Sequence, residues 1–133
     1  MTCYAERTFD AVCSLLEKGF GACAAKVNEL HGDGIKLPEK YVAGSGNEQK
    51  LFPPCIIVSY RETEYMQKDR IIELCVYTVG ISFDIGKKIS MRQRFRLEEA
   101  LALFAEENRR CNLWQSLKVE KASESGCILR IEV

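Results

Sequence analysis

The chain has 133 residues, of which 47% are hydrophobic and 29% charged, a composition typical of one globular domain. Its 19 basic and 19 acidic residues balance, which argues against the basic excess of nucleic-acid-binding domains. No apolar run is long enough for a membrane helix, and the first residues lack the pattern of a secretory signal, so we expect no membrane association and a cytosolic location.

The seven cysteines carry no recognisable motif. Their number is odd, no C-x-x-C occurs, and the spacing of zinc ribbons or thioredoxin-like sites is absent. Several stand where an apolar residue would otherwise lie, which is typical of reduced cysteines buried as small hydrophobic groups. These are Cys13, Cys23, Cys55, Cys75 and Cys127. We therefore predict reduced core cysteines and neither a metal nor a cofactor.

Residues 5–31 are predicted to form the first helix. Apolar residues recur there every three or four positions, from Phe9 to Leu30, as on one face of an α-helix. Gly32 and Gly34 follow directly, and glycine is favoured just beyond a helix C-terminus. His31, the only histidine, is predicted to interact with the terminal carbonyl groups of this helix.

Residues 32–54 form a long connection that holds four of the nine glycines and all three prolines. Its stretch GSGNEQK is not a phosphate-binding loop, because the lysine is followed by leucine, no strand precedes it and Pro-Pro follows. Long connections in compact domains are usually functional. We expect a mobile loop, with residues 39–52 becoming ordered against a protein partner. Its candidate interface residues are Gly44, Ser45, Gly46, Lys50 and Phe52.

Two strands follow, at residues 55–65 and 70–85, with a turn at 66–69. Both are rich in β-branched and aromatic residues. The second strand is apolar on both alternating sets of side chains, which is typical of a central strand or of one covered on its second face. That cover could be a helix or another subunit.

A second helix is predicted from Ser90 to about Arg110. Ser90 and Gln93 match a capping box, and an apolar stripe runs along the helix. The stripe consists of Phe95, Leu97, Ala100, Leu101, Phe104 and Ala105. Residues 114–122 and 127–133 alternate as strands. The order α-β-β-α-β-β predicts a single α+β domain of two layers, an antiparallel sheet with both helices packed on one face.

Charged residues offer interaction sites rather than chemistry. Glu62 and Glu64 share a strand face and are predicted to form cross-strand charge pairs. Arg92 and Arg94 open the second helix without an obvious local partner, whereas Arg96 can pair with Glu99. The two arginines could face solvent, acidic residues of another subunit or, less in keeping with the balanced charge, nucleic acid. No nucleophile, base and oxyanion site assemble, so we predict that the protein is not an enzyme.

The layout resembles the small tail-terminator and tail-completion proteins of long-tailed phages and prophages, together with related head–tail joining components. The resemblance rests on the stretch "GDGIKLPEKY" after the first helix and on "KLFPPCIIVSY", which leads into the first strand. It also rests on the order of elements from about residue 10 to 133. The cysteine content has no counterpart in that family.

The resemblance implies a non-enzymatic subunit that forms a ring, commonly a hexamer, and docks on the tail tube or neck. It would assemble in the bacterial host cytoplasm and join the virion, without a cofactor. Two alternatives stay open from the residues alone. One is a small-ligand or regulatory binding domain of the same fold class, and the other is a nucleic-acid adaptor that uses Arg92, Arg94 and Arg96.

Overall fold

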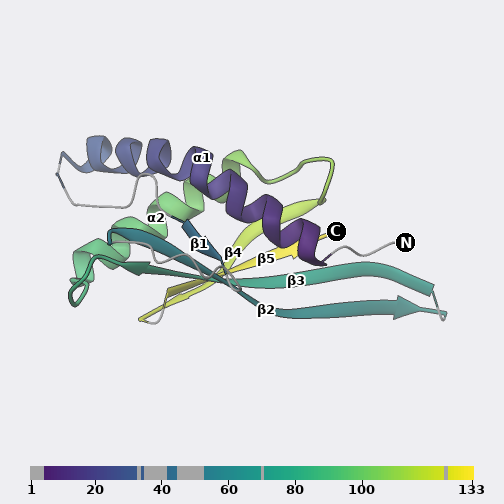
Figure 1. Ribbon diagram of the computed structural model, residues 1–133. Coiled ribbons are helices and arrows are strands. Elements are labelled where there is room, and N and C mark those ends of the chain that lie inside the picture. The colour runs from purple at the N-terminus through teal and green to yellow at the C-terminus, as the bar shows by residue number, and fades with distance from the viewer. Residues whose placement is uncertain (1–4, 33, 35–41, 45–52, 70, 125) are drawn as a thin grey trace.

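The structure, a computed structural model, describes residues 5–32, 34, 42–44, 53–69, 71–124 and 126–133. Two helices pack on one face of a sheet, which confirms the predicted two-layer α+β fold (Figure 1). The elements are α1 (Ala5–His31), β1 (Val42–Gly44), β2 (Cys55–Lys68), β3 (Ile71–Asp84), α2 (Met91–Glu107), β4 (Ser116–Ser123) and β5 (Gly126–Glu132). No helix within these ranges is both long and apolar enough to cross a membrane.

The sheet has the order β1-β2-β3-β5-β4. Strands β2, β3, β5 and β4 pair antiparallel with one another, as predicted. The short strand β1 was not predicted, and it pairs with β2 in the parallel direction, Val42 opposite Ile56. Part of the connection at 32–54 is therefore sheet rather than loop, and the expectation that no strand precedes GSGNEQK is wrong. The sequence could not indicate this because three residues are too few to show an alternating pattern.

The hairpin between β2 and β3 is longer and tighter than predicted. The first strand was expected to end at residue 65, but β2 continues to Lys68, which pairs with Ile71. Asp69 has a φ of 52°, in the left-handed region that tight turns use. The register shifts between Tyr60 and Glu62 and between Met66 and Gln67 break the alternation and hide the end of the strand from a sequence pattern.

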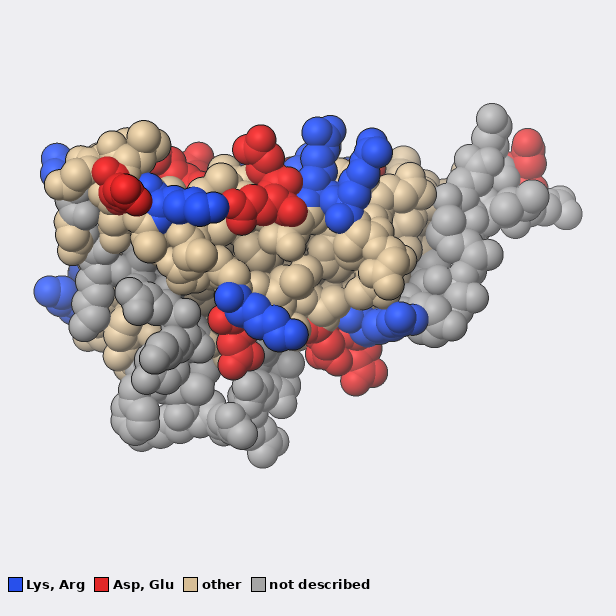
Figure 2. Space-filling view, turned by 90° about the horizontal axis from the view of Figure 1, so that it is seen from above, with Lys and Arg blue, Asp and Glu red and all other residues tan. Residues whose placement is uncertain are grey.

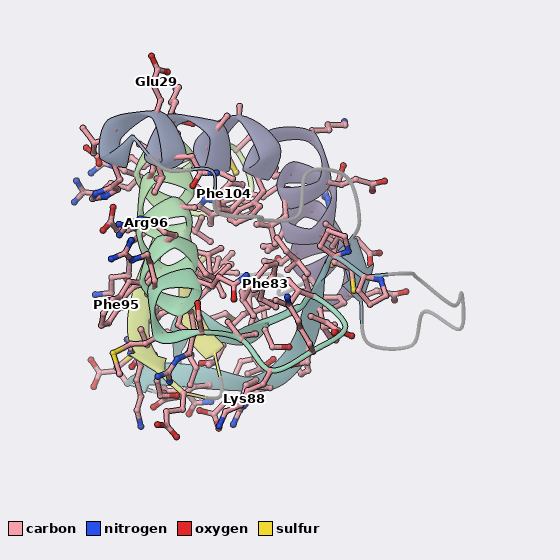
Figure 3. The ribbon with its side chains drawn as sticks, turned by 90° about the vertical axis from the view of Figure 1, so that its left-hand side faces the viewer. Glu29, Phe83, Lys88, Phe95, Arg96 and Phe104 are labelled. Atoms are coloured by element: carbon pink, nitrogen blue, oxygen red, sulfur yellow. The ribbon has the colours of Figure 1, made fainter. Side chains whose placement is uncertain are left out.

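The core lies between the helices and the sheet face that they cover. The buried side chains of α2 are Leu97, Ala100, Leu101, Phe104 and Ala105, as its predicted stripe requires. Phe95 was predicted in the same stripe, but its side chain is 53% exposed. It stands two residues before Leu97, about 200° around the helix, so it points away from the sheet. Figure 3 shows Phe83 and Phe104 pointing into the interior and Phe95 pointing outward.

The end of α1 and the start of α2 are each set by local residues. Gly32 has a φ of 64° just beyond the end of α1, as expected of glycine at a helix C-terminus. At the start of α2, the Ser90 Oγ accepts from the Gln93 amide at 3.1 Å and the Gln93 side chain accepts from the Ser90 amide at 2.9 Å. The predicted capping box is confirmed.

The cysteines differ from the prediction at one position. Cys13, Cys23, Cys55, Cys111 and Cys127 are free thiols, and three of them are buried. Cys75, which is fully buried in β3, is disulfide-bonded, so the prediction of reduced core cysteines is wrong there. A disulfide joins residues that are close in space, and spacing along the chain does not reveal such a pair.

Candidate interaction surfaces

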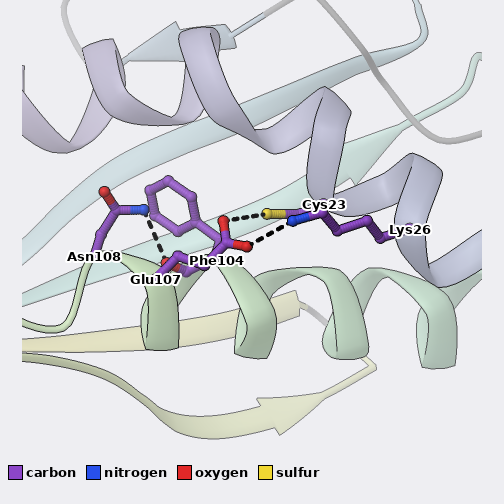
Figure 4. Close-up of polar contacts among 5 residues, drawn as sticks. All are labelled: Cys23, Lys26, Phe104, Glu107 and Asn108. Atoms are coloured by element: carbon purple, nitrogen blue, oxygen red, sulfur yellow. Dashed lines mark hydrogen bonds and ion pairs between the residues drawn. The ribbon is translucent and has the colours of Figure 1, made fainter.

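Three polar contacts fix α2 against α1. The Glu107 carboxylate accepts from the Lys26 ammonium at 3.0 Å and from the Cys23 thiol at 3.5 Å (Figure 4). These hydrogen bonds lower the pKa of Glu107, whereas burial and then the Glu107 charge raise the pKa of Cys23 to about 11. Towards the other end of α2, the Glu99 carboxylate lies 2.6 Å from the His31 Nε2. His31 lies in the last turn of α1, as predicted, and also pairs with a second helix, a contact that was not predicted.

The first turns of α2 border an apolar pocket, which we call the α2 pocket. It encloses about 470 Å³ between α2, the end of β3 and the β4–β5 hairpin. Its apolar lining includes Phe83, Ile89, Met91, Phe95 and Leu97, and its charged lining is Arg94, Glu98 and Glu124. Met91 and Phe95 are more than half exposed, so the pocket continues into an apolar surface patch.

The three arginines of α2 do not form a shared basic patch. The Arg94 guanidinium lies 3.8 Å from the Glu124 carboxylate at the α2 pocket, and that of Arg96 lies 3.5 Å from Glu99, as predicted. Arg92 is exposed at the helix start. Because two of the three are held beside carboxylates, this arrangement disfavours a phosphate-binding surface made of all three.

A second apolar surface lies on the extension of the β2–β3 hairpin. Strand β5 pairs with β3 only from Val76 to Ile81, and residues 65–68 of β2 pair with residues 71–75 of β3, beyond the last pair with β5. We call these residues the β2–β3 arm. Tyr65 is 54% exposed and Met66 is 44% exposed. At the base of the arm, the ring of Phe9 from α1 meets Tyr60 edge-to-face, with ring centroids 6.3 Å apart.

The two apolar surfaces lie at opposite ends of the molecule. In Figure 1 the β2–β3 arm reaches beyond the helices on the right, and the chain enters α2 on the left. Between them, the helical layer carries interspersed acidic and basic side chains, as the view from above in Figure 2 shows. Apolar side chains are therefore exposed towards both ends of the molecule, and charged side chains lie along the helical layer between them.

The predicted interface residues are only partly brought together. Gly44 ends the edge strand β1, and Arg92 and Arg94 begin α2, with Arg94 in the α2 pocket. Ser45, Gly46, Lys50 and Phe52 lie outside the described residues, as does most of the predicted mobile segment. Sequence reasoning missed Met91, Phe95 and Tyr65 as surface residues. The sequence did contain one sign that Phe95 would be exposed, because its position lies off the helical face formed by the buried residues of α2.

No three His, Cys, Asp or Glu side chains of the described residues lie in positions that could hold a metal ion. Glu62 and Glu64 line an open hollow with Arg61 and Arg130. Their partners on β3 are Thr78 and Val76, so the predicted cross-strand charge pairs are not formed among the described residues.

No family model matches this chain, and no curated protein or solved structure matches it either.

Proposed function

We propose that the protein is a non-enzymatic assembly subunit, of the kind found at the tail terminus or head–tail junction of long-tailed phages and prophages. It would act by self-association into a ring and by docking on a tail-tube or neck protein. The order of its elements and the stretches "GDGIKLPEKY" and "KLFPPCIIVSY" support this class. The α+β fold is consistent with it, although a fold alone does not define a function.

The β2–β3 arm is the observation that carries the proposal. A two-stranded ribbon is marginally stable in water, and this one exposes Tyr65 and Met66. Exposed aromatic and methionine side chains are enriched at the cores of protein interfaces. An arm that reaches past its own core is therefore best explained by a surface that covers it in the assembly.

The separation of the two apolar surfaces supports a ring over a two-fold dimer. A contact between the arm of one copy and the α2 pocket of the next would join different patches at opposite ends of the molecule. Such head-to-tail contacts produce closed rings when the rotation between copies closes, and filaments when it does not. If the arm mediates self-association, the separation of the two patches supports a ring over a two-fold dimer.

The test is the molar mass of the protein in solution across a range of concentrations, measured by size-exclusion chromatography with light scattering. We expect an assembly of several copies that is lost when Tyr65 and Met66 are both changed to serine. Leu30→Ser is the matched control, since Leu30 is 78% exposed at the end of α1, outside both surfaces. A protein that stays monomeric at all concentrations and binds neither tail-tube nor neck protein would overturn the proposal.

A small-ligand or regulatory binding domain is the second candidate, and the α2 pocket favours it. Its volume of about 470 Å³ lies within the range of small-molecule sites, which are mostly apolar with a few polar groups. Thermal-shift screening against metabolites and nucleotides would detect such a ligand. A stabilisation of several degrees that Phe95→Ala abolishes would favour this function, and its absence would favour the assembly subunit.

A further inference from the structure

The sheet face away from the helices, here called the outer face, carries a polar hollow centred on Gly80. A row of paired residues crosses four strands there, Ser59 on β2, Gly80 on β3, Ile128 on β5 and Lys121 on β4. Neighbouring strands lie about 4.8 Å apart, so the first and last backbones of this row are roughly 14 Å apart. Long side chains from the two flanking strands can therefore meet above the middle of the row.

Two β-bulges direct the charged side chains of this hollow. The register of β2 shifts between Tyr60 and Glu62, and Arg61 is the residue left between them. The register of β4 shifts between Val119 and Lys121. Regular alternation after Val119, which packs against the core, would point Lys121 inward, but the bulge pairs it with Ile128 on the outer face. Bulges commonly re-aim side chains next to functional sites.

The lining of the hollow suits an anion. It encloses about 230 Å³ and is lined by the cations Arg61 and Lys121 and by Ser59, Ser82 and Ser123, with no carboxylate among the described residues that line it. A Cβ atom at Gly80 would lie 2.8 Å from the Ser59 Oγ and 3.1 Å from the Arg61 Cδ. The absence of a side chain at Gly80 thus leaves room for the stem of Arg61 to lie across the sheet.

The nearby carboxylates lie in an adjoining hollow. It is lined by Glu62, Glu64, Glu120 and Arg130 and shares Arg61 and Lys121 with the first. Arg130 is held by Glu132 at 3.1 Å and by Glu120 at 3.9 Å. Within the described ranges, Arg61 and Lys121 make no ion pair or hydrogen bond, so both cations are available to a ligand.

We propose that the hollow over Gly80 binds a phosphate-type oxyanion between Arg61 and Lys121. The planar guanidinium of Arg61 can donate two parallel hydrogen bonds to such a group, and the Lys121 ammonium supplies a second charge. The hydroxyls of Ser59 and Ser82 can donate from the floor. The oxyanion could belong to free phosphate or to the backbone of a nucleic acid. The site does not depend on the proposed assembly function.

Calorimetric titration at low ionic strength tests the site with two probes, sodium phosphate and a short oligothymidylate. We expect saturable binding of at least one probe, weakened about tenfold or more by Arg61→Gln and by Lys121→Gln. Phosphate binding alone identifies a free anion, and binding of the oligothymidylate alone identifies a phosphodiester. Gly80→Ala should weaken binding as well, because the added methyl group would displace Arg61 or Ser59.

Lys118→Gln is the matched control, because Lys118 is exposed on the same strand, pairs with Arg130 and does not line the hollow. Thermal unfolding of each variant establishes that it is folded. The proposal is overturned if neither probe binds up to about 10 mM, which corresponds to less than about 3 kcal/mol of binding free energy. It is also overturned if Lys118→Gln weakens binding as much as Lys121→Gln, since the effect would then come from overall charge alone.

Discussion

The two faces of the sheet are made from the same strands, yet they differ in burial, in polarity and in the regularity of their side-chain alternation. On the face under the helices, Leu129 and Ile131 of β5 are fully buried. Their neighbours Ile128 and Arg130 point to the outer face and are only partly buried. The first face is closed by apolar packing, and the second is left with bulges, serines and charges. Departures from strict alternation therefore mark where the sheet is available to something other than its own core.

The largest expected effect comes from adjacent residues on opposite faces. Leu129→Ala should lower the free energy of unfolding by about 2–5 kcal/mol, because it leaves a cavity under the helices. Ile128→Ala should cost about 1 kcal/mol or less, because its side chain keeps part of its contact with water. Urea denaturation measures the free energy of unfolding of both variants. Equal losses would mean that the outer face is as closed as the inner one.

The next effect concerns thiol reactivity on the closed face. Burial, with a smaller contribution from the charge of Glu98, raises the pKa of Cys127 from 9.0 to about 11. At pH 8 this lowers its thiolate fraction by about 100-fold, and the thiolate is the reactive form. We expect iodoacetamide to alkylate the exposed Cys111 far faster than Cys127, as peptide mass spectrometry over time can show. Comparable rates would indicate that the hairpin of β4 and β5 opens readily.

The raised pKa of Cys127 also makes the free energy of unfolding depend on pH. Because the pKa of Cys127 is raised in the folded state, its contribution is fully present below pH 9 and is lost as the pH rises through about 11. In that window the unfolded chain releases its thiol proton before the folded chain does. The free energy of unfolding should fall between pH 8 and pH 10.5, and less steeply in Cys127→Ala. Cys111→Ser, which removes a thiol at an exposed position, is the matched control variant.

The smallest effect is a gain in stability. The hydroxyl of Tyr77 is buried on the closed face and has no hydrogen-bond partner in the described part of the chain. Tyr77→Phe removes this unsatisfied group and should raise the free energy of unfolding by about 1 kcal/mol. Tyr60→Phe is the control, since Tyr60 is 38% exposed and its hydroxyl can reach water. A loss of stability in Tyr77→Phe would mean that the hydroxyl has a partner after all.

Much of the fold could be predicted because its signals are local. The periodicity of α1, the capping box of Ser90 and the alternation of β5 each depend on residues within a few positions of one another. The surfaces were harder to predict. The residues predicted from the long connection are undescribed apart from Gly44, and Arg94 was identified without the apolar pocket beside it. Tyr65 and Lys121 gave no signal, since their exposure depends on where strand pairing stops or shifts register.

Local sequence sufficed to predict the kind and order of the helices and long strands and the apolar set that each buries, because backbone propensity and side-chain period act over short distances. Which surfaces stay open depends on long-range packing instead. Strand β1, the bulges at Arg61 and Glu120, the pairing of His31 with Glu99 and the disulfide of Cys75 all depend on residues far apart in the chain. Contacts between residues far apart in the chain depend on how the elements pack. The α2 pocket, the β2–β3 arm and the hollow over Gly80 therefore form only when the chain folds.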